Sequence, residues 1–127
     1  IYSQEGQMGE YAQALKKGAE SSGHRVTLKE AVVGRDIVSC HSYDLLMVGS
    51  PLSGLFRVKI ATDIRNYLSA LKRTAGQESI AFTEKKLIGT DKGLRSLMAT
   101  MESQGCIVKD FRGFKSTDEA FAYGKGI

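Results

Sequence analysis

The chain has 127 residues, of which 42% are hydrophobic and 25% charged, and its formal net charge is +4. This length most economically forms one domain, residues 1–127, whose core needs no disulfides. The scattered basic residues argue against a nucleic-acid binder, and no apolar run approaches the roughly 20 residues that span a membrane. No signal peptide is visible, and Cys40 and Cys106 form no metal-binding motif. We therefore expect a cytoplasmic protein with buried, reduced thiols.

The first half of the sequence alternates between predicted strands and helices. Residues 1–3 end a first strand that we expect to be incomplete, because strands usually contain about five or six residues. Apolar residues at helical spacing predict a helix over 9–22, and alternating residues predict a short strand over 25–29. Residues 36–42 form a polar connector. The continuous apolar run 45–48 predicts a central parallel strand, because both of its faces must be buried.

The second half continues the alternation. Its predicted elements are a helix over 60–71, a strand over 79–83, a helix over 91–104 and a strand over 106–111. Ser116 and Glu119 form a capping-box pattern, which predicts a short C-terminal helix. The regular alternation predicts a doubly wound α/β fold, in which ligands bind beyond the carboxyl ends of the strands.

Three loops follow strands at that edge of the predicted sheet and should converge in space. They cover residues 3–9, 50–57 and 84–93. The glycines of the first loop can build an anion-binding turn before a helix, although Glu5 adds a negative charge there. A tight strand-to-helix turn without a ligand explains the same glycines.

Three segments carry a resemblance to a known family. They are YSQEGQM at 2–8, YDLLMVGSPLSG at 43–54 and LMATMESQGCIVKDF at 97–111. Over nearly the whole chain the sequence resembles the flavodoxin-like family. The resemblance implies a three-layer α/β/α sandwich with a parallel, doubly wound sheet of about five strands. It also implies FMN as cofactor, with its phosphate in the first loop and its isoalloxazine ring between the two later loops.

The resemblance also assigns residues to the cofactor. The family's phosphate loop carries three hydroxyl residues, of which this chain keeps Ser3, whereas Glu5 and Met8 stand at the other two positions. Backbone N–H groups can still hold a phosphate, so the resemblance implies a weakened cradle. The expected cofactor-binding residues are Ser3, Gln4, Glu5, Gly6, Gln7 and Met8 in the first loop, Ser50, Pro51, Leu52, Ser53, Gly54 and Phe56 in the second, and Thr83, Glu84, Lys85 and Lys86 in the third. No catalytic or metal-binding residue is expected.

The leading functional hypothesis is an FMN-binding electron-transfer protein, or an FMN-dependent oxidoreductase. Its expected partner is an acidic redox protein or a quinone-like acceptor, and Lys85 and Lys86 predict a less negative flavin potential than in an acidic flavodoxin. The alternative is a cofactor-free binding or regulatory module, which Glu5 and Met8 favour. A flavin reductase that uses NAD(P)H is a third hypothesis, for which no nicotinamide pocket is evident. Missing motifs exclude phospho-acceptor receivers, GxGxxG dinucleotide-binding proteins and P-loop NTPases.

Overall fold

The computed structural model describes residues 1–34, 37–54 and 57–127. Its elements are α1 (Met8–Ser21), the 3-10 helix η1 (Cys40–Ser42), β1 (Leu46–Gly49), β2 (Leu52–Ser53), β3 (Lys59–Ile60), α2 (Thr62–Ala70), β4 (Glu78–Glu84), α3 (Thr90–Ser103), β5 (Ile107–Phe114) and α4 (Thr117–Lys125). The alternation of strands and helices confirms the predicted α/β class. Within these described ranges, no helix combines the length and the apolar character needed to cross a membrane.

The main sheet is parallel and has the strand order β1-β4-β5. Beyond β1 it is extended only by single bridges, in which Tyr2 pairs in parallel with Gly49 on one side and with Glu30 on the other. Within the described residues the sheet therefore has three parallel strands rather than about five. Tyr2 forms one residue pair on each side instead of a ladder, with the N–H of Tyr2 donating to the carbonyl oxygen of Lys29 at 2.9 Å and the N–H of Ser3 donating to that of Gly49 at 3.0 Å. The bridges nevertheless give the spatial order Glu30 segment, Tyr2, β1, β4, β5, in which strand order reverses between Tyr2 and β1.

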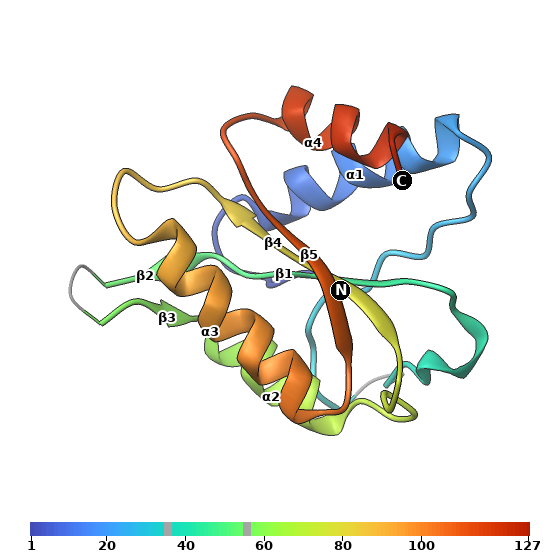
Figure 1. Ribbon diagram of the computed structural model, residues 1–127, viewed down its shortest axis with the longest axis horizontal. Coiled ribbons are helices and arrows are strands. Elements are labelled where there is room, and N and C mark those ends of the chain that lie inside the picture. The colour runs from blue at the N-terminus through green and yellow to red at the C-terminus, as the bar shows by residue number, and fades with distance from the viewer. Residues whose placement is uncertain (35–36, 55–56) are drawn as a thin grey trace.

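Helices cover both faces of this sheet, which confirms the three-layer sandwich (Figure 1). On one face, α2 and α3 bury Ile64 and Leu97 completely. On the other face, α1 and α4 pack over Phe82 and Phe114, and these two rings are 6.2 Å apart between centroids. Apolar residues at helical spacing therefore form the inner stripe of each helix, as the sequence pattern predicts.

The close packing of α1 on α4 depends on a glycine in α1. A Cβ atom on Gly18 would overlap the backbone carbonyl of Phe121 and lie 2.8 Å from the backbone nitrogen of Lys125. The start of α4 follows the predicted capping box, because the N–H of Glu119 donates to Oγ of Ser116 at 3.2 Å. The carboxylate of Glu119 in turn accepts the N–H of Lys115 at 2.8 Å. The capping box thus sets where α4 begins, and Gly18 lets α4 pack closely on α1.

The loop expected after the central strand contains a small antiparallel hairpin. β2 and β3 pair Leu52 with Ile60 and Ser53 with Lys59. Leu52 lies against α3 so closely that a Cβ on Gly93 would be 2.6 Å from its Cδ2 atom. The hairpin therefore packs on α3, and it lies at the edge of the sheet where the loops gather.

Candidate functional site

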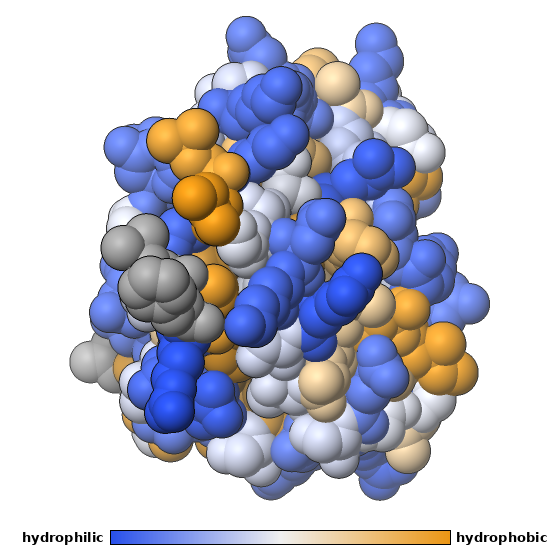
Figure 2. Space-filling model, turned by 60° about the vertical axis from the view of Figure 1, so that its left-hand side comes forward, coloured by the Kyte–Doolittle hydropathy of each residue, from blue (hydrophilic) through white to orange (hydrophobic). Residues whose placement is uncertain are grey.

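The loops that follow Tyr2, β1 and β4 lie along the same edge of the molecule, as the sequence predicts. They gather at the left-hand side of Figure 1, where α1 begins and the hairpin β2–β3 projects. The loops come close to one another at two points along this edge. A Cβ on Gly6 would be 3.6 Å from Cβ of Pro51, and Nζ of Lys86 donates to the carbonyl oxygen of Gly54 at 3.2 Å. Figure 2 turns this edge forward and shows hydrophobic side chains exposed among hydrophilic ones.

The first loop binds a carboxylate of the same chain. Ser3 is 1% exposed, and its hydroxyl donates to Asp63, with Oγ 2.8 Å from Oδ1 and 2.9 Å from Oδ2. The backbone N–H of Gln4 donates to Oδ2 at 2.8 Å, and the N–H of Glu5 donates to Oγ of Ser3 at 3.1 Å. Gly6 supports the turn with a φ of 64°, which few other residues adopt. The loop therefore has the donors of an anion cradle, and an anionic group occupies it.

Asp63 reaches the first loop because of how α2 begins. Ser50 is completely buried, and its Oγ accepts the backbone N–H of Ala61 at 2.8 Å while donating to the carbonyl oxygen of Pro51 at 2.8 Å. Ala61 is the N-cap of α2 and has no side-chain cap of its own. Ser50 thus ties the first turn of α2, which carries Asp63, to the end of β1. The sequence gives no direct sign of Asp63, because an acidic residue in a first helical turn is ordinary.

The remaining residues of the first loop differ in what they can offer a ligand. Gln4, Glu5 and Gln7 are exposed at the edge, whereas the side chain of Met8 is 1% exposed. Met8 packs in the core cluster that includes Phe82. A ligand in this loop can therefore meet only the backbone of Met8.

The second loop presents mainly backbone to this edge. Ser53 and Gly54 are exposed, and Pro51 and Leu52 are half-buried. Gly54 has a φ of 92°, and a Cβ there would overlap the carbonyl oxygen of Arg57. The other residue predicted here, Phe56, lies outside the described residues.

The third loop combines a buried hydroxyl with an exposed apolar tip. Thr83 is completely buried, and its Oγ1 is the single buried side-chain polar atom without a hydrogen-bond partner in the described part of the chain. Glu84 and Lys85 are exposed. Leu87 and Ile88 are 103% and 70% exposed, so the tip of the loop presents apolar side chains to solvent.

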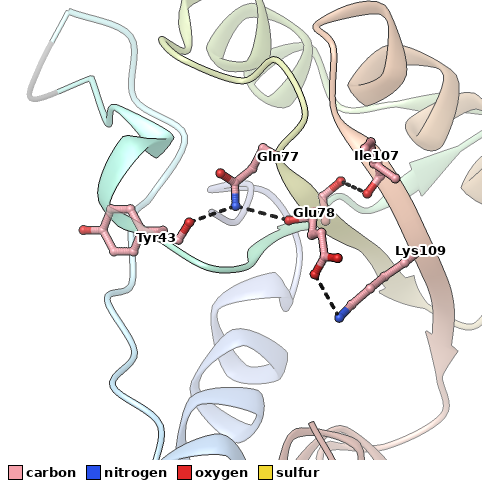
Figure 3. Close-up of polar contacts among 6 residues, drawn as sticks. Tyr43, Gln77, Glu78, Ile107 and Lys109 are labelled. Atoms are coloured by element: carbon pink, nitrogen blue, oxygen red, sulfur yellow. Dashed lines mark hydrogen bonds and ion pairs between the residues drawn. The ribbon is translucent and has the colours of Figure 1, made fainter.

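A large cavity lies elsewhere, at the amino-terminal end of the strands. Its volume is about 830 Å³, and Tyr43, Glu78 and Lys109 are among its lining residues. Figure 3 shows Glu78 and Lys109 pointing toward one another, with Oε2 and Nζ 3.5 Å apart. Nε2 of Gln77 donates to the carbonyl oxygen of Tyr43 at 3.1 Å, which ties the entry to β1 onto the start of β4.

The thiols and the possible metal ligands point to no further chemistry. Burial raises the pKa of Cys40, and burial together with the neighbouring Cys40 thiol raises the pKa of Cys106. Both thiols are buried and form no disulfide in the described part of the chain, as the sequence predicts. Within residues 1–34, 37–54 and 57–127, no group of three or more His, Cys, Asp or Glu residues could hold a metal ion.

Comparison with known proteins supports the fold. No family model and no curated protein sequence matches the chain. Among solved structures, oxidised flavodoxin 1 from Bacillus cereus superposes with a TM-score of 0.67, covering 98% of this chain and 91% of that chain. The two sequences are 12% identical. The chain therefore has a flavodoxin-like fold, and at this identity the likeness concerns the fold alone.

Proposed function

We propose that this protein binds a flavin at the carboxyl edge of its sheet, FMN being the form that the fold implies, and carries electrons. The observation that carries the proposal is the first loop, whose Ser3 hydroxyl and Gln4 N–H converge on the carboxylate of Asp63. A hydroxyl and a backbone N–H before a helix are the donors that a phosphate group needs. The donors of an anion site are therefore present where the resemblance puts the phosphate, and in this structure they bind the carboxylate of Asp63.

The other two loops supply what a flat ring requires. Leu87 and Ile88 would cover an apolar ring face and exclude water from it, while the exposed backbone of Ser53 and Gly54 allows close approach on the opposite side. When bound, the flavin supplies the electron-transfer chemistry, and the protein binds, orients and shields it. Lys86, bonded to Gly54, places a positive charge between these loops, which favours an electron-rich reduced cofactor.

The proposed partner of this carrier is an acidic redox protein or a quinone-like acceptor. The net charge of +4 supports an acidic protein, because complementary charge speeds association at low ionic strength. A cofactor-free binding or regulatory module is the second candidate. The contact of Asp63 with Ser3 and Gln4 favours this second candidate, because Asp63 already satisfies the donors of the cradle.

Titration of the purified protein with FMN tests the proposal. We expect saturable quenching of flavin fluorescence at one FMN per chain. Lys86→Met should weaken binding, because it removes the ammonium that bridges the second and third loops. Lys109→Met, which removes the same charge beside the distant cavity, is the matched control and should leave the affinity unchanged. Failure of both FMN and riboflavin to bind, or equal effects of the two variants, would contradict the proposed site and favour the cofactor-free module.

A further inference from the structure

The side chain of Asp63 does more than stabilise its own helix. One carboxylate oxygen accepts the N–H of the adjacent Ile64 at 2.7 Å, which is a local contact in the first turn of α2. Both oxygens also reach across to a loop 60 residues earlier in the chain, where they accept the Ser3 hydroxyl. The side chain therefore joins α2 to the cradle through charge-assisted hydrogen bonds, which are stronger than neutral ones.

These contacts use the first donors that a phosphate would meet. The Ser3 hydroxyl has one proton, and it points at Asp63. The Gln4 N–H is directed at the same carboxylate, and the Glu5 N–H is directed at Oγ of Ser3. A phosphate at this position would have to displace Asp63 or lie beside it. Lying beside it places two anions in contact, and the exposed Glu5 adds a third negative charge.

A neutral hydroxyl group at this position would be attracted to Asp63 rather than repelled by it. The terminal alcohol of a ribityl chain is a hydrogen-bond donor, and a carboxylate is an acceptor with several lone pairs. Asp63 could therefore keep its bonds to Ser3 and Gln4 and accept one more from such an alcohol. The occupied cradle is chemically complementary to a flavin without phosphate.

We infer that Asp63 determines the flavin specificity of this site, by standing in place of the phosphate and removing the advantage that FMN would otherwise have over riboflavin. The inference rests on the proposed flavin site and specifies its ligand class. The protein then binds riboflavin at least as tightly as FMN. Neutralising Asp63 opens the cradle to phosphate and restores a preference for FMN.

The test compares FMN and riboflavin as ligands of the wild type and of Asp63→Asn, by quenching of flavin fluorescence. The isosteric asparagine keeps an acceptor for the Gln4 N–H, and Asp63→Ala serves as a second variant. Asp118→Asn is the matched control, because Asp118 is an exposed residue in the first turn of α4. We expect Asp63→Asn to tighten FMN binding by about tenfold while riboflavin affinity changes by less than about threefold. A wild type that prefers FMN, or a variant that shifts both affinities equally, would overturn the inference.

A second measurement separates this inference from the proposed function. Inorganic phosphate is added to ¹⁵N-labelled protein, and the amide resonance of Gln4 is followed. The inference predicts that phosphate shifts this resonance in Asp63→Asn and leaves it in place in the wild type. If neither flavin binds any variant but phosphate behaves in this way, the proposed function fails and the role of Asp63 as an internal anion stands. Equal phosphate binding by both proteins would refute that role.

Discussion

Replacing Ser50 by alanine should loosen the start of α2 and, with it, the cradle. The substitution removes the acceptor of the backbone N–H of Ala61, a residue that is only 8% exposed. A buried donor left without a partner costs about 1–3 kcal/mol, and the small side chain that replaces the hydroxyl adds no strain. For a chain of this length, 1 kcal/mol corresponds to a shift of about 4 °C in Tm. We therefore expect Tm to fall by about 4–12 °C.

Thermal and denaturant unfolding of the Ser50→Ala variant measure this effect. Ser53→Ala is the control for stability, because Ser53 is exposed in the same loop and should change the free energy of unfolding by less than about 0.5 kcal/mol. The amide resonance of Gln4 reports whether Asp63 has moved with the first turn of α2. A Ser50→Ala protein as stable as the wild type would refute the argument that this hydroxyl fastens α2 to β1.

Three further predictions concern the rest of the fold. Gly18→Ala should lower the free energy of unfolding by up to about 2 kcal/mol, because overpacking against the backbone of α4 costs about 1–3 kcal/mol and helix propensity returns only about 1 kcal/mol; a rise in Tm would contradict it. Cys40 and Cys106, whose pKa values burial raises, should react with a thiol reagent only after unfolding, and rapid labelling of the native protein would contradict their burial. Burial and the hydrogen bond to Asp110 raise the pKa of Tyr123 to about 12, so an absorbance titration should show tyrosine ionisation that continues well above the ordinary value of 10.0 and that Tyr123→Phe shortens. Because this pKa is higher in the folded state, its contribution to stability is complete below pH 10 and is lost as pH rises through 12, a loss that Tyr123→Phe should abolish.

Much of the fold follows from local patterns in the sequence. The helix expected over 9–22 is α1 (Met8–Ser21), and the helix expected over 91–104 is α3 (Thr90–Ser103). Both could be predicted because apolar residues that recur every three or four positions over a long segment indicate an amphipathic helix. The alternating segment 25–29 predicts a strand and does not form one. Val26 and Leu28 are half-buried as the alternation suggests, yet only one residue of the neighbouring segment, Tyr2, is placed to pair. Side-chain alternation does not show whether the neighbouring segment is long enough to pair along the whole predicted strand.

The candidate site could be predicted from the sequence only in part. The convergence of the three loops could be predicted, because the carboxyl ends of parallel strands share one edge. The contact between Asp63 and Ser3 could not, since it depends on how the buried Ser50 anchors α2 and on residues 60 positions apart. Met8 illustrates the same limit, because its place in the family's motif suggests a ligand contact whereas its side chain packs in the core.

The location of a bound flavin on the protein decides between the two ends of the sheet. FMN and riboflavin are titrated separately into ¹⁵N-labelled wild-type protein, and shifts of backbone amides are mapped. We expect the riboflavin shifts to cluster at residues 3–7, 52–54 and 84–89, at the carboxyl edge of the sheet, and FMN to cause no stronger effect there. Shifts confined to residues 23–28 and 42–45, which line the cavity at the opposite end of the strands, or no shifts with either flavin, would contradict this expectation.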